Sequence, residues 1–413
     1  MSLGSSTTKQ AAMQELAALR DRILRDMRYP GGAWETPDGL PSAVPQKPPK
    51  RCLSNVVLPL LNDPAYGVRG NDFTGGVEVD GRPVTDAAES EIALALEATY
   101  NLTVPTKLVS EALRLVASQV RYHPVQDYLD GLTWDGVERV DTWLEDYLGA
   151  TDVPRGVGRR FLLSVARRVL EPGCKVGTTL ILVGEQGIGK SSALRTLLPE
   201  TAWFSDTPID LRSKDAYLAM QGVWLYEVSE LSAWRARDAE SIKAFLSAQV
   251  DRFRPPYGRN MVTLPRQTVF VGTTNEAEFL DDPTGSRRFW PVRVGDCSVE
   301  ALGEDRDQLW AEASMRARAG EQHWLDRGEA AELIEAQGEY QRRDPWEEKV
   351  EAFIAVRDEV SAAEVLTDAL ALDSAGQHRG AAMRLAGLLK SLGWRKKRVR
   401  RGGHNARVWV RDL

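Results

Sequence analysis

The chain contains 413 residues, 43% of them hydrophobic and 27% charged, which is enough to bury the cores of two or three domains and excludes general disorder. Its net charge of −6 excludes a uniformly basic coat protein but is compatible with a local basic patch. The three cysteines are widely separated and indicate neither a disulfide framework nor a CxxC metal site. This cysteine usage is typical of a protein in a reducing cytoplasm. We find no secretory signal and no apolar run of membrane-spanning length, so we expect a cytoplasmic protein without a membrane partner.

The first part of the chain, residues 1–54, begins with a short helical pattern, QAAMQELAALRDRILRDM. The proline- and glycine-rich stretch that follows it predicts a linker or a long surface loop. Residues 55–152 then carry apolar residues at helical spacing, most clearly in ESEIALALEATY and TKLVSEALRLVASQV. We expect this segment to be a small, α-rich accessory domain.

Residues 153–300 alternate between short β-rich runs and helical segments. The runs TTLILV, VWLY and TVFVGTT are typical of buried strands, and SSALRTLL, DAYLAM and ESIKAFLSAQ are typical of helices. This alternation predicts an α/β domain in which helices cover a largely parallel sheet. A charged helical stretch over residues 301–345 is predicted to form a linker or lid after this domain.

Residues 346–413 form a compact last segment with two predicted helices, SAAEVLTDALAL and RGAAMRLAGLLKSLG. Two β-like runs follow, one on each side of Gly402 and Gly403. This order is typical of a winged helix, which would place Arg384 and Lys390 on or near its recognition helix.

Basic residues crowd the two β-like runs, although the chain as a whole is acidic. No acid lies between Trp394 and Arg411, so this wing is expected to contact DNA phosphates. A disordered basic tail is the alternative, which the strand-like alternation disfavours. The basic residues are Arg395, Lys396, Lys397, Arg398, Arg400, Arg401, Arg407 and Arg411.

The segment GEQGIGKSS fills the GxxxxGK[ST] pattern of a phosphate loop, between a predicted buried strand and a predicted helix. Its glycines let backbone N–H groups point into one concavity, Lys190 would reach the β- and γ-phosphates, and the Ser191 hydroxyl would ligate Mg²⁺. A glycine-rich turn with a coincidental Lys-Ser pair is the alternative. The expected nucleotide-binding residues are Gly184, Gly187, Ile188, Gly189, Lys190, Ser191 and Ser192.

Two acids and an asparagine follow strand-like runs downstream of this loop. Glu227 directly follows the apolar run Val223–Tyr226 and is expected to end this strand, and Glu230 comes three residues later. One of the two carboxylates could hold Mg²⁺ and the other could orient the attacking water. Asn275 ends the run TVFVGTT, where its amide could contact the γ-phosphate. The alternatives are a solvated acid at a helix start and an asparagine that caps a turn.

Two arginines, Arg287 and Arg288, follow a Gly-Ser turn and precede an apolar strand. A guanidinium presented rigidly in this way could neutralise phosphate charge in the site of a neighbouring subunit. A surface ion pair is the alternative.

The segment IKAFLSAQVDRFRPPYGRNMVTLPRQ places turn residues between two extended runs, which predicts a β-hairpin. Arg254, Tyr257 and Arg259 lie at its centre, and cations beside an aromatic ring are what a contact with single-stranded DNA uses. A purely structural hairpin with solvated charges is equally compatible with this pattern.

Taken together, these segments resemble the virulence-associated protein E family, ATPases of phages and genomic islands that are related to superfamily 3 helicases. The resemblance covers about residues 55–294 and is far more specific than the phosphate loop alone. The segments that carry it are YHPVQDYLDGLTWDGVERVDTWL, EPGCK, GEQGIGKSS, WLYEVSEL, IKAFLSAQVDRFRPPYGR, PRQTVFVGTTN and DDPTGSRRFWPV.

The resemblance implies a P-loop, AAA+-like core that assembles into a ring, a homo-hexamer, with ATP and Mg²⁺ between subunits. It assigns Walker B roles to Glu227 and Glu230, the sensor role to Asn275 and the trans-acting arginine to Arg287 or Arg288. The predicted hairpin would line the channel of the ring. Relatives are often fused to a primase, for which residues 1–54 are too few, so a separate primase polypeptide is implied.

Two functions fit these features. The first is an ATP-dependent, ring-forming DNA helicase or translocase that replicates a phage or mobile element in a bacterial host. The second is a DNA-binding initiator or regulator whose assembly ATP switches without unwinding. The hairpin and Arg287/Arg288 favour the first function, whereas a winged helix fits either.

Overall fold

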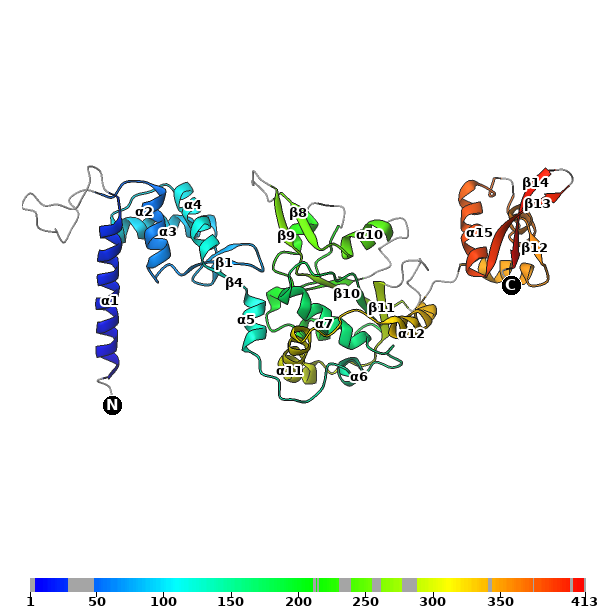
Figure 1. Cartoon of the computed structure of the whole chain (residues 1–413), viewed down its shortest axis with the longest axis horizontal. Helices are drawn as coiled ribbons and strands as arrows, with labels where there is room; N and C mark the ends of the chain where they lie inside the picture. Colours follow the sequence, from blue (N-terminus) through cyan, green and yellow to red (C-terminus); the bar gives the residue numbers. More distant parts are fainter. Residues whose placement is uncertain are drawn as a thin grey trace, which may run out of the picture. The chain divides into compact units, whose positions relative to one another are not determined.

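The computed structural model describes residues 4–28, 48–210, 213, 215–229, 239–254, 261–276, 288–340, 344–373, 375–401 and 404–411. The chain divides into two compact units, a larger one that ends at Gly338 and a smaller one that begins at Glu339 (Figure 1). Within the described ranges, no helix is long and apolar enough to cross a membrane.

The first part of the larger unit combines helices with a small mixed sheet of order β3-β2-β1-β4. Thr85 caps α3 by accepting a hydrogen bond from the Ala88 amide, and Asn101 ends this helix in the left-handed conformation. Helices α3 and α4 confirm the two helices predicted here. The elements are α1 (Gly4–Asp26), α2 (Leu53–Asn62), β1 (Val68–Asn71), β2 (Val77–Val79), β3 (Arg82–Pro83), α3 (Asp86–Tyr100), α4 (Thr106–Gln119) and β4 (Arg121–Tyr122).

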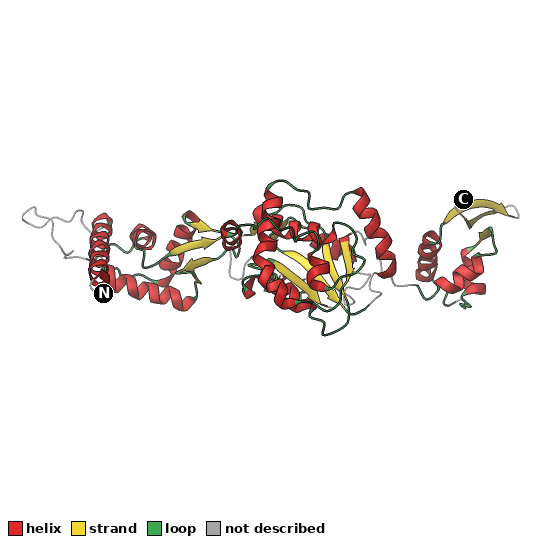
Figure 2. Cartoon of the chain, turned by 90° about the horizontal axis from the view of Figure 1, so that it is seen from below, coloured by secondary structure: helices red, strands yellow, loops and turns green. Residues whose placement is uncertain are grey.

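The second part of the larger unit is built on a five-stranded parallel sheet of order β11-β5-β10-β7-β6, which confirms the predicted α/β class with a parallel sheet. Every residue of β5 and β10 is buried, as expected for central parallel strands covered on both faces. Figure 2 shows helices on both sides of these strands. The strands are β5 (Thr179–Val183), β6 (Phe204–Ser205), β7 (Leu225–Ser229), β10 (Val269–Thr274) and β11 (Phe289–Arg293).

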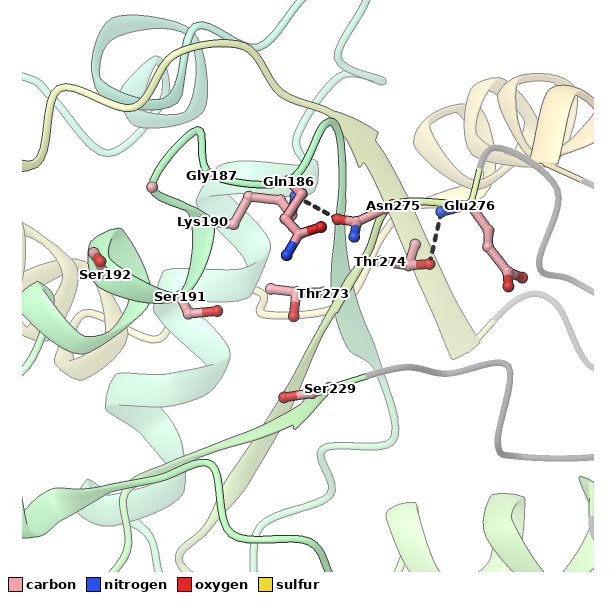
Figure 3. Close-up of a pocket in the computed structure, with 11 residues that line it drawn as sticks. Gln186, Gly187, Lys190, Ser191, Ser192, Ser229, Thr273, Thr274, Asn275 and Glu276 are labelled. Carbon is pink, nitrogen blue, oxygen red and sulfur yellow. Dashed lines mark hydrogen bonds between the residues drawn. The ribbon is translucent and has the colours of Figure 1, made fainter.

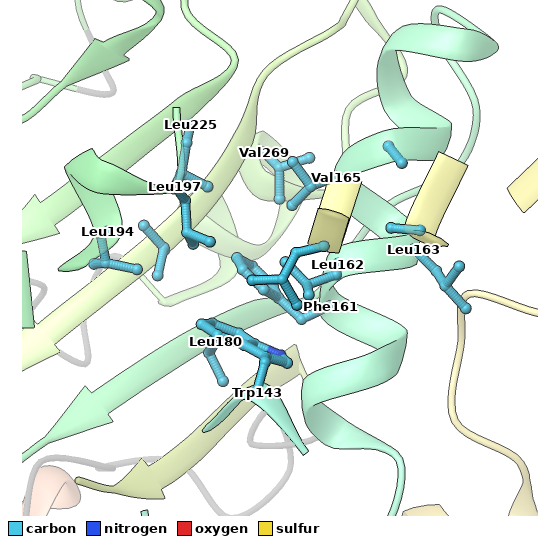
Figure 4. Close-up of a cluster of buried hydrophobic side chains, with 14 of the residues drawn as sticks. Trp143, Phe161, Leu162, Leu163, Val165, Leu180, Leu194, Leu197, Leu225 and Val269 are labelled. Atoms are coloured by element: carbon cyan, nitrogen blue, oxygen red, sulfur yellow. The ribbon is translucent and has the colours of Figure 1, made fainter. Parts of the chain in front are cut away.

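Aliphatic and aromatic side chains together fill the core between this sheet and its helices (Figure 4). The Trp224 and Trp310 rings lie 4.5 Å apart, and their indole N–H groups donate to the carbonyls of Val165 and Leu197. The helices are α5 (Pro124–Gly131), α6 (Trp143–Leu148), α7 (Val157–Leu170), α8 (Lys190–Thr196), α9 (Asp215–Ala219), α10 (Ala239–Leu246), α11 (Val299–Arg318) and α12 (Arg327–Gln337).

The hydrophobic clusters divide the larger unit at a different place from the predicted boundary at residue 152. The first cluster ends at Ala117, whereas Val125 and Trp143 already belong to the second, because α5 and α6 pack against α7. Helix α11, predicted as part of a linker or lid, buries Leu309 and Trp310 in this same second cluster. Sequence periodicity identifies a helix but does not reveal which core it joins.

A separate antiparallel pair, β8 (Val250–Phe253) and β9 (Val262–Pro265), precedes β10 and matches the strands of the predicted hairpin. Its base is buried: the Arg266 side chain is 1% exposed and forms an ion pair with Asp251. The Arg266 guanidinium also donates to the Phe245 carbonyl at the end of α10. Arg266 therefore closes the base of the hairpin and fastens it to the helix before it.

The smaller unit packs helices against an antiparallel sheet of order β12-β14-β13. The predicted second helix and both β-like runs are present. The predicted first helix is only partly α-helical, since Ser361 caps three residues that continue into a π-helical turn over Val365–Ala369. The elements are α13 (Glu347–Ile354), β12 (Glu359–Val360), α14 (Ala362–Glu364), α15 (Arg379–Ser391), β13 (Trp394–Arg401) and β14 (His404–Arg411).

Candidate functional site

The loop between β5 and α8 needs glycine at three positions. Gly187 and Gly189 have φ angles of 89° and 93°, in the left-handed region that favours glycine. A Cβ at Gly184 would lie 2.8 Å from the Val294 carbonyl oxygen and 2.7 Å from Ile188 Cδ1. The predicted glycine pattern therefore has a direct conformational or steric cause.

A pocket of about 570 Å³ lies over this loop (Figure 3). The strands are parallel, so the loop after β5 and the ends of β7 and β10 meet at the same edge of the sheet, where α/β proteins bind ligands. The pocket is lined by Gln186, Gly187, Gly189, Lys190, Ser191 and Ser192 from the loop and α8, by Ser229 from β7, and by Thr273, Thr274, Asn275 and Glu276 from β10 and the residues after it.

Lys190 begins α8 and is 7% exposed. Its Nζ donates to the carbonyl oxygens of Gly184 at 2.7 Å and Glu185 at 2.6 Å, and to Oδ1 of Asn275 at 3.0 Å. These acceptors match the three donors of an ammonium group. Burial lowers the pKa of Lys190, which Cys297 and the Glu227 charge oppose only in part.

Glu227 is buried, with 1% of its surface exposed, and is not among the residues that line the pocket, but it contacts two of them. Its Oε1 accepts hydrogen bonds from the Ser191 and Thr273 hydroxyls, both at 2.6 Å. Its Oε2 is buried and has no hydrogen-bond partner among the described residues. An unpartnered buried carboxylate oxygen is costly, and carboxylate and hydroxyl oxygens suit a hard divalent cation. Glu227 and Ser191 therefore fit the predicted Mg²⁺ ligands.

The position of Glu227 in its strand corrects the sequence prediction. Glu227 does not end the strand but lies in the middle of β7, which runs from Leu225 to Ser229. The strand continues because Val228 and Ser229 pair in register with Gly272 and Thr273 of β10. Apolar composition identified the buried start of the strand, but pairing with its neighbour set the end.

Several pocket residues were absent from the sequence prediction: Gln186, Ser229, Thr273 and Glu276. Thr273 was detectable, because residues two apart on a strand share a face and Asn275 had already been assigned to the site. Ser229 had no such signal, since its place depends on the end of β7.

Other predicted site residues lie away from the pocket or outside the described residues. The Ile188 side chain packs against the core cluster of the central sheet. Arg288 Nε donates to the Ser247 hydroxyl at 3.1 Å, and Arg288 is not among the residues that line the pocket. Arg254 is exposed after β8. Glu230, Tyr257, Arg259 and Arg287 fall outside the described residues.

The basic residues of the smaller unit lie mainly on its long β-hairpin. Lys397 and Arg398 are exposed on β13, and Lys396 Nζ lies 5.6 Å from the Trp409 ring centroid. Arg395 is exposed on β13, and Arg407 and Arg411 are exposed on β14. Arg400 and Arg401 are the last two residues of β13, and their side chains fall outside the described residues.

The two basic residues predicted near a recognition helix both lie on α15. Lys390 is exposed. Arg384 forms a bidentate ion pair with Asp344, with distances of 2.9 Å from Nε to Oδ2 and 2.6 Å from Nη2 to Oδ1. Its guanidinium also lies 4.1 Å from the Trp346 ring centroid. Arg384 is thus engaged within the unit.

Comparison with known proteins gives one family and a set of distant structures. Two apo structures of the NrS-1 C-terminal region each share 12% sequence identity with this chain. The alignment with the first covers 87% of this chain and 98% of that structure, with a TM-score of 0.45. The alignment with the second covers 84% of this chain and 97% of that structure, with a TM-score of 0.49. No curated protein sequence matches the chain. A sequence profile of the virulence-associated protein E-like domain matches residues 129–342. Because this match spans more than half of the chain, the protein belongs to the virulence-associated protein E-like domain family.

Proposed function

We propose that this protein is an ATP-dependent DNA helicase or translocase that replicates a phage or mobile genetic element in the bacterial cytoplasm. The observation that carries the proposal is the hydrogen-bonded cluster at one edge of the parallel sheet. There the lysine of the phosphate loop contacts Asn275, and the Ser191 hydroxyl contacts the buried Glu227 carboxylate.

ATP with Mg²⁺ is the ligand that this cluster suits best. The loop amides, the N-terminus of α8 and Lys190 would hold the phosphates, and Ser191 and Glu227 would hold Mg²⁺. When bound, Mg²⁺ neutralises phosphate charge. Lys190 would exchange its present acceptors, including Asn275, for phosphate oxygens, so Asn275 is suited to respond to the γ-phosphate. Glu230 is the second candidate acid, to orient the attacking water.

The order of the strands favours an AAA+-like core. Strand β10 lies between β5, which leads into the phosphate loop, and β7, which carries Glu227. Polar residues at the end of β10 are therefore within reach of both. In a ring, a homo-hexamer, Arg287 or Arg288 would reach the site of the neighbouring subunit. The contact of Arg288 with Ser247, away from this chain's own pocket, is compatible with that role.

Two surfaces are suited to DNA. The β8–β9 hairpin would present Arg254, Tyr257 and Arg259 to a single strand in the channel of the ring. The helix α15 with the β13–β14 hairpin supports a winged helix, whose exposed lysines and arginines would contact duplex phosphates. A separate primase would supply the primers.

The phosphate loop is tested by Lys190→Ala, with the exposed Lys107→Ala as control. Lys190→Ala should lower ATP hydrolysis about 10²–10³-fold, the loss seen when one charge-stabilising donor is removed, and should abolish unwinding of a forked duplex. Lys107→Ala should match the wild type. A wild-type chain that binds no nucleotide would overturn the proposal, and ATP hydrolysis without strand separation would favour the ATP-switched initiator.

A further inference from the structure

Thr273 is a buried hydroxyl residue at the pocket edge that the proposed nucleotide chemistry does not yet use. It lies in β10, is 7% exposed and pairs with Leu182 of β5 and Ser229 of β7. Its Oγ1 donates to Glu227 Oε1 at 2.6 Å. Thr273 thus contacts the candidate metal-binding carboxylate directly from the neighbouring strand, and its side chain is among those drawn around the pocket in Figure 3.

The two oxygens of the Glu227 carboxylate have different surroundings. Oε1 accepts from both Ser191 and Thr273, whereas Oε2 has no hydrogen-bond partner in the described part of the chain. Rotation of the carboxylate out of this orientation would break both hydrogen bonds to a charged acceptor. The two hydroxyls therefore fix the orientation of the carboxylate and leave one of its oxygens for a ligand.

The two hydroxyls are not equivalent. Ser191 belongs to the phosphate loop and is itself a candidate Mg²⁺ ligand, so cation binding changes its environment. Thr273 belongs to a central strand that is buried along its whole length, which gives it a fixed position. Two residues later in the same segment, Asn275 contacts Lys190. The end of β10 therefore holds both the acid and the lysine of the site.

We propose that Thr273 is a positioning residue that orients the Glu227 carboxylate for Mg²⁺–ATP. The inference rests on the proposed function and extends it to a residue outside the phosphate loop. This role requires the hydroxyl group of residue 273. A serine at this position should therefore keep the role, whereas a valine, which has nearly the same shape as threonine but no hydroxyl, should lose it.

The test measures binding of a fluorescent ATP analogue during titration with Mg²⁺ and also in EDTA. Thr273→Val should raise the Mg²⁺ concentration for half-maximal binding about tenfold, because one hydrogen bond to a charged group is lost. The affinity for the analogue in EDTA should be unchanged. Thr273→Ser should restore the wild-type titration. Thermal unfolding in EDTA checks that each variant is folded.

A double-mutant cycle with Glu227→Gln separates positioning from general packing. Because Thr273 acts through the carboxylate, Thr273→Val should have little further effect on the Mg²⁺ titration in a Glu227→Gln background. Equal loss of binding with and without Mg²⁺, an unchanged titration for Thr273→Val, or additive effects in the cycle would overturn the inference. Failure of the wild type to bind the analogue would instead refute the proposed function.

Discussion

The β8–β9 hairpin and the β13–β14 hairpin are fastened in different ways. In β8–β9, four residues of each strand pair, and the base is held by the buried ion pair between Arg266 and Asp251. In β13–β14, eight residues of each strand pair, and the hairpin is anchored by Trp394 and Trp409 in the hydrophobic core of the smaller unit.

The two hairpins also differ in how the chain connects them to the pocket over the loop between β5 and α8. Strand β9 ends at Pro265, and the chain runs through Arg266 directly into β10, whose far end lines the pocket. The β13–β14 hairpin belongs to the other unit. We therefore expect changes at the base of β8–β9 to alter ATP and DNA binding together, and changes on β13 to alter DNA binding alone.

The largest effect should come from breaking the buried ion pair. Asp251→Ala should destabilise the larger unit by about 3–5 kcal/mol, because it leaves the Arg266 charge buried without its partner. Guanidinium unfolding combined with hydrogen exchange of β8–β10 measures this loss. Arg252→Ala, exposed on the same strand, is the matched control and should stay within about 0.5 kcal/mol. Equal stability of the two variants would show that the ion pair between Arg266 and Asp251 does not hold the base of the hairpin.

A smaller effect, confined to DNA, should follow from neutralising β13. The triple variant Lys396→Ala, Lys397→Ala and Arg398→Ala should weaken duplex binding and reduce the salt dependence by about 0.9 in log–log slope per lost phosphate contact. Binding measured at several salt concentrations gives this slope, while ATP hydrolysis without DNA should equal the wild type. Lys349→Ala, exposed on α13, is the control. An unchanged slope in the triple variant would contradict the wing assignment.

The smallest effect should come from the half-exposed ion pair of the smaller unit. Burial alone would raise the pKa of Asp344, but hydrogen bonds from Arg384 and the Trp346 amide outweigh it, so the pKa lies below its ordinary value. A lowered carboxyl pKa gives stability that is present above about pH 4 and is lost as pH falls through the folded-state pKa.

Unfolding measured between pH 6 and 3, with hydrogen exchange of α15 as the probe, should show this loss. Because the pair is partly exposed, the loss should be about 1 kcal/mol or less. Asp344→Asn should remove this part of the pH dependence. A pH profile identical in both proteins would show that Asp344 does not stabilise the unit.

Local sequence patterns predicted the elements that depend on neighbouring residues. The glycine spacing predicted the loop over 184–189, and apolar runs predicted β5 and β10, because backbone conformation and strand burial are encoded within a few residues. The hairpin strands and α15 were predicted for the same reason. The partial failure at 361–372 shows the limit of this approach, since a helical apolar pattern does not distinguish an α-helix from a π-helical turn.

The sequence alone thus determined the family, the glycine-rich loop over residues 184–189, Lys190 and Glu227 as candidate residues, and the basic character of the last hairpin. Only the tertiary structure decided that Glu227 lies within its strand, that Thr273 and Ser191 share one of its oxygens, and that Arg384 is paired with Asp344. These features join residues distant in the chain through strand register and side-chain packing. Local composition does not encode such contacts, because each depends on the position of a partner set by the whole fold.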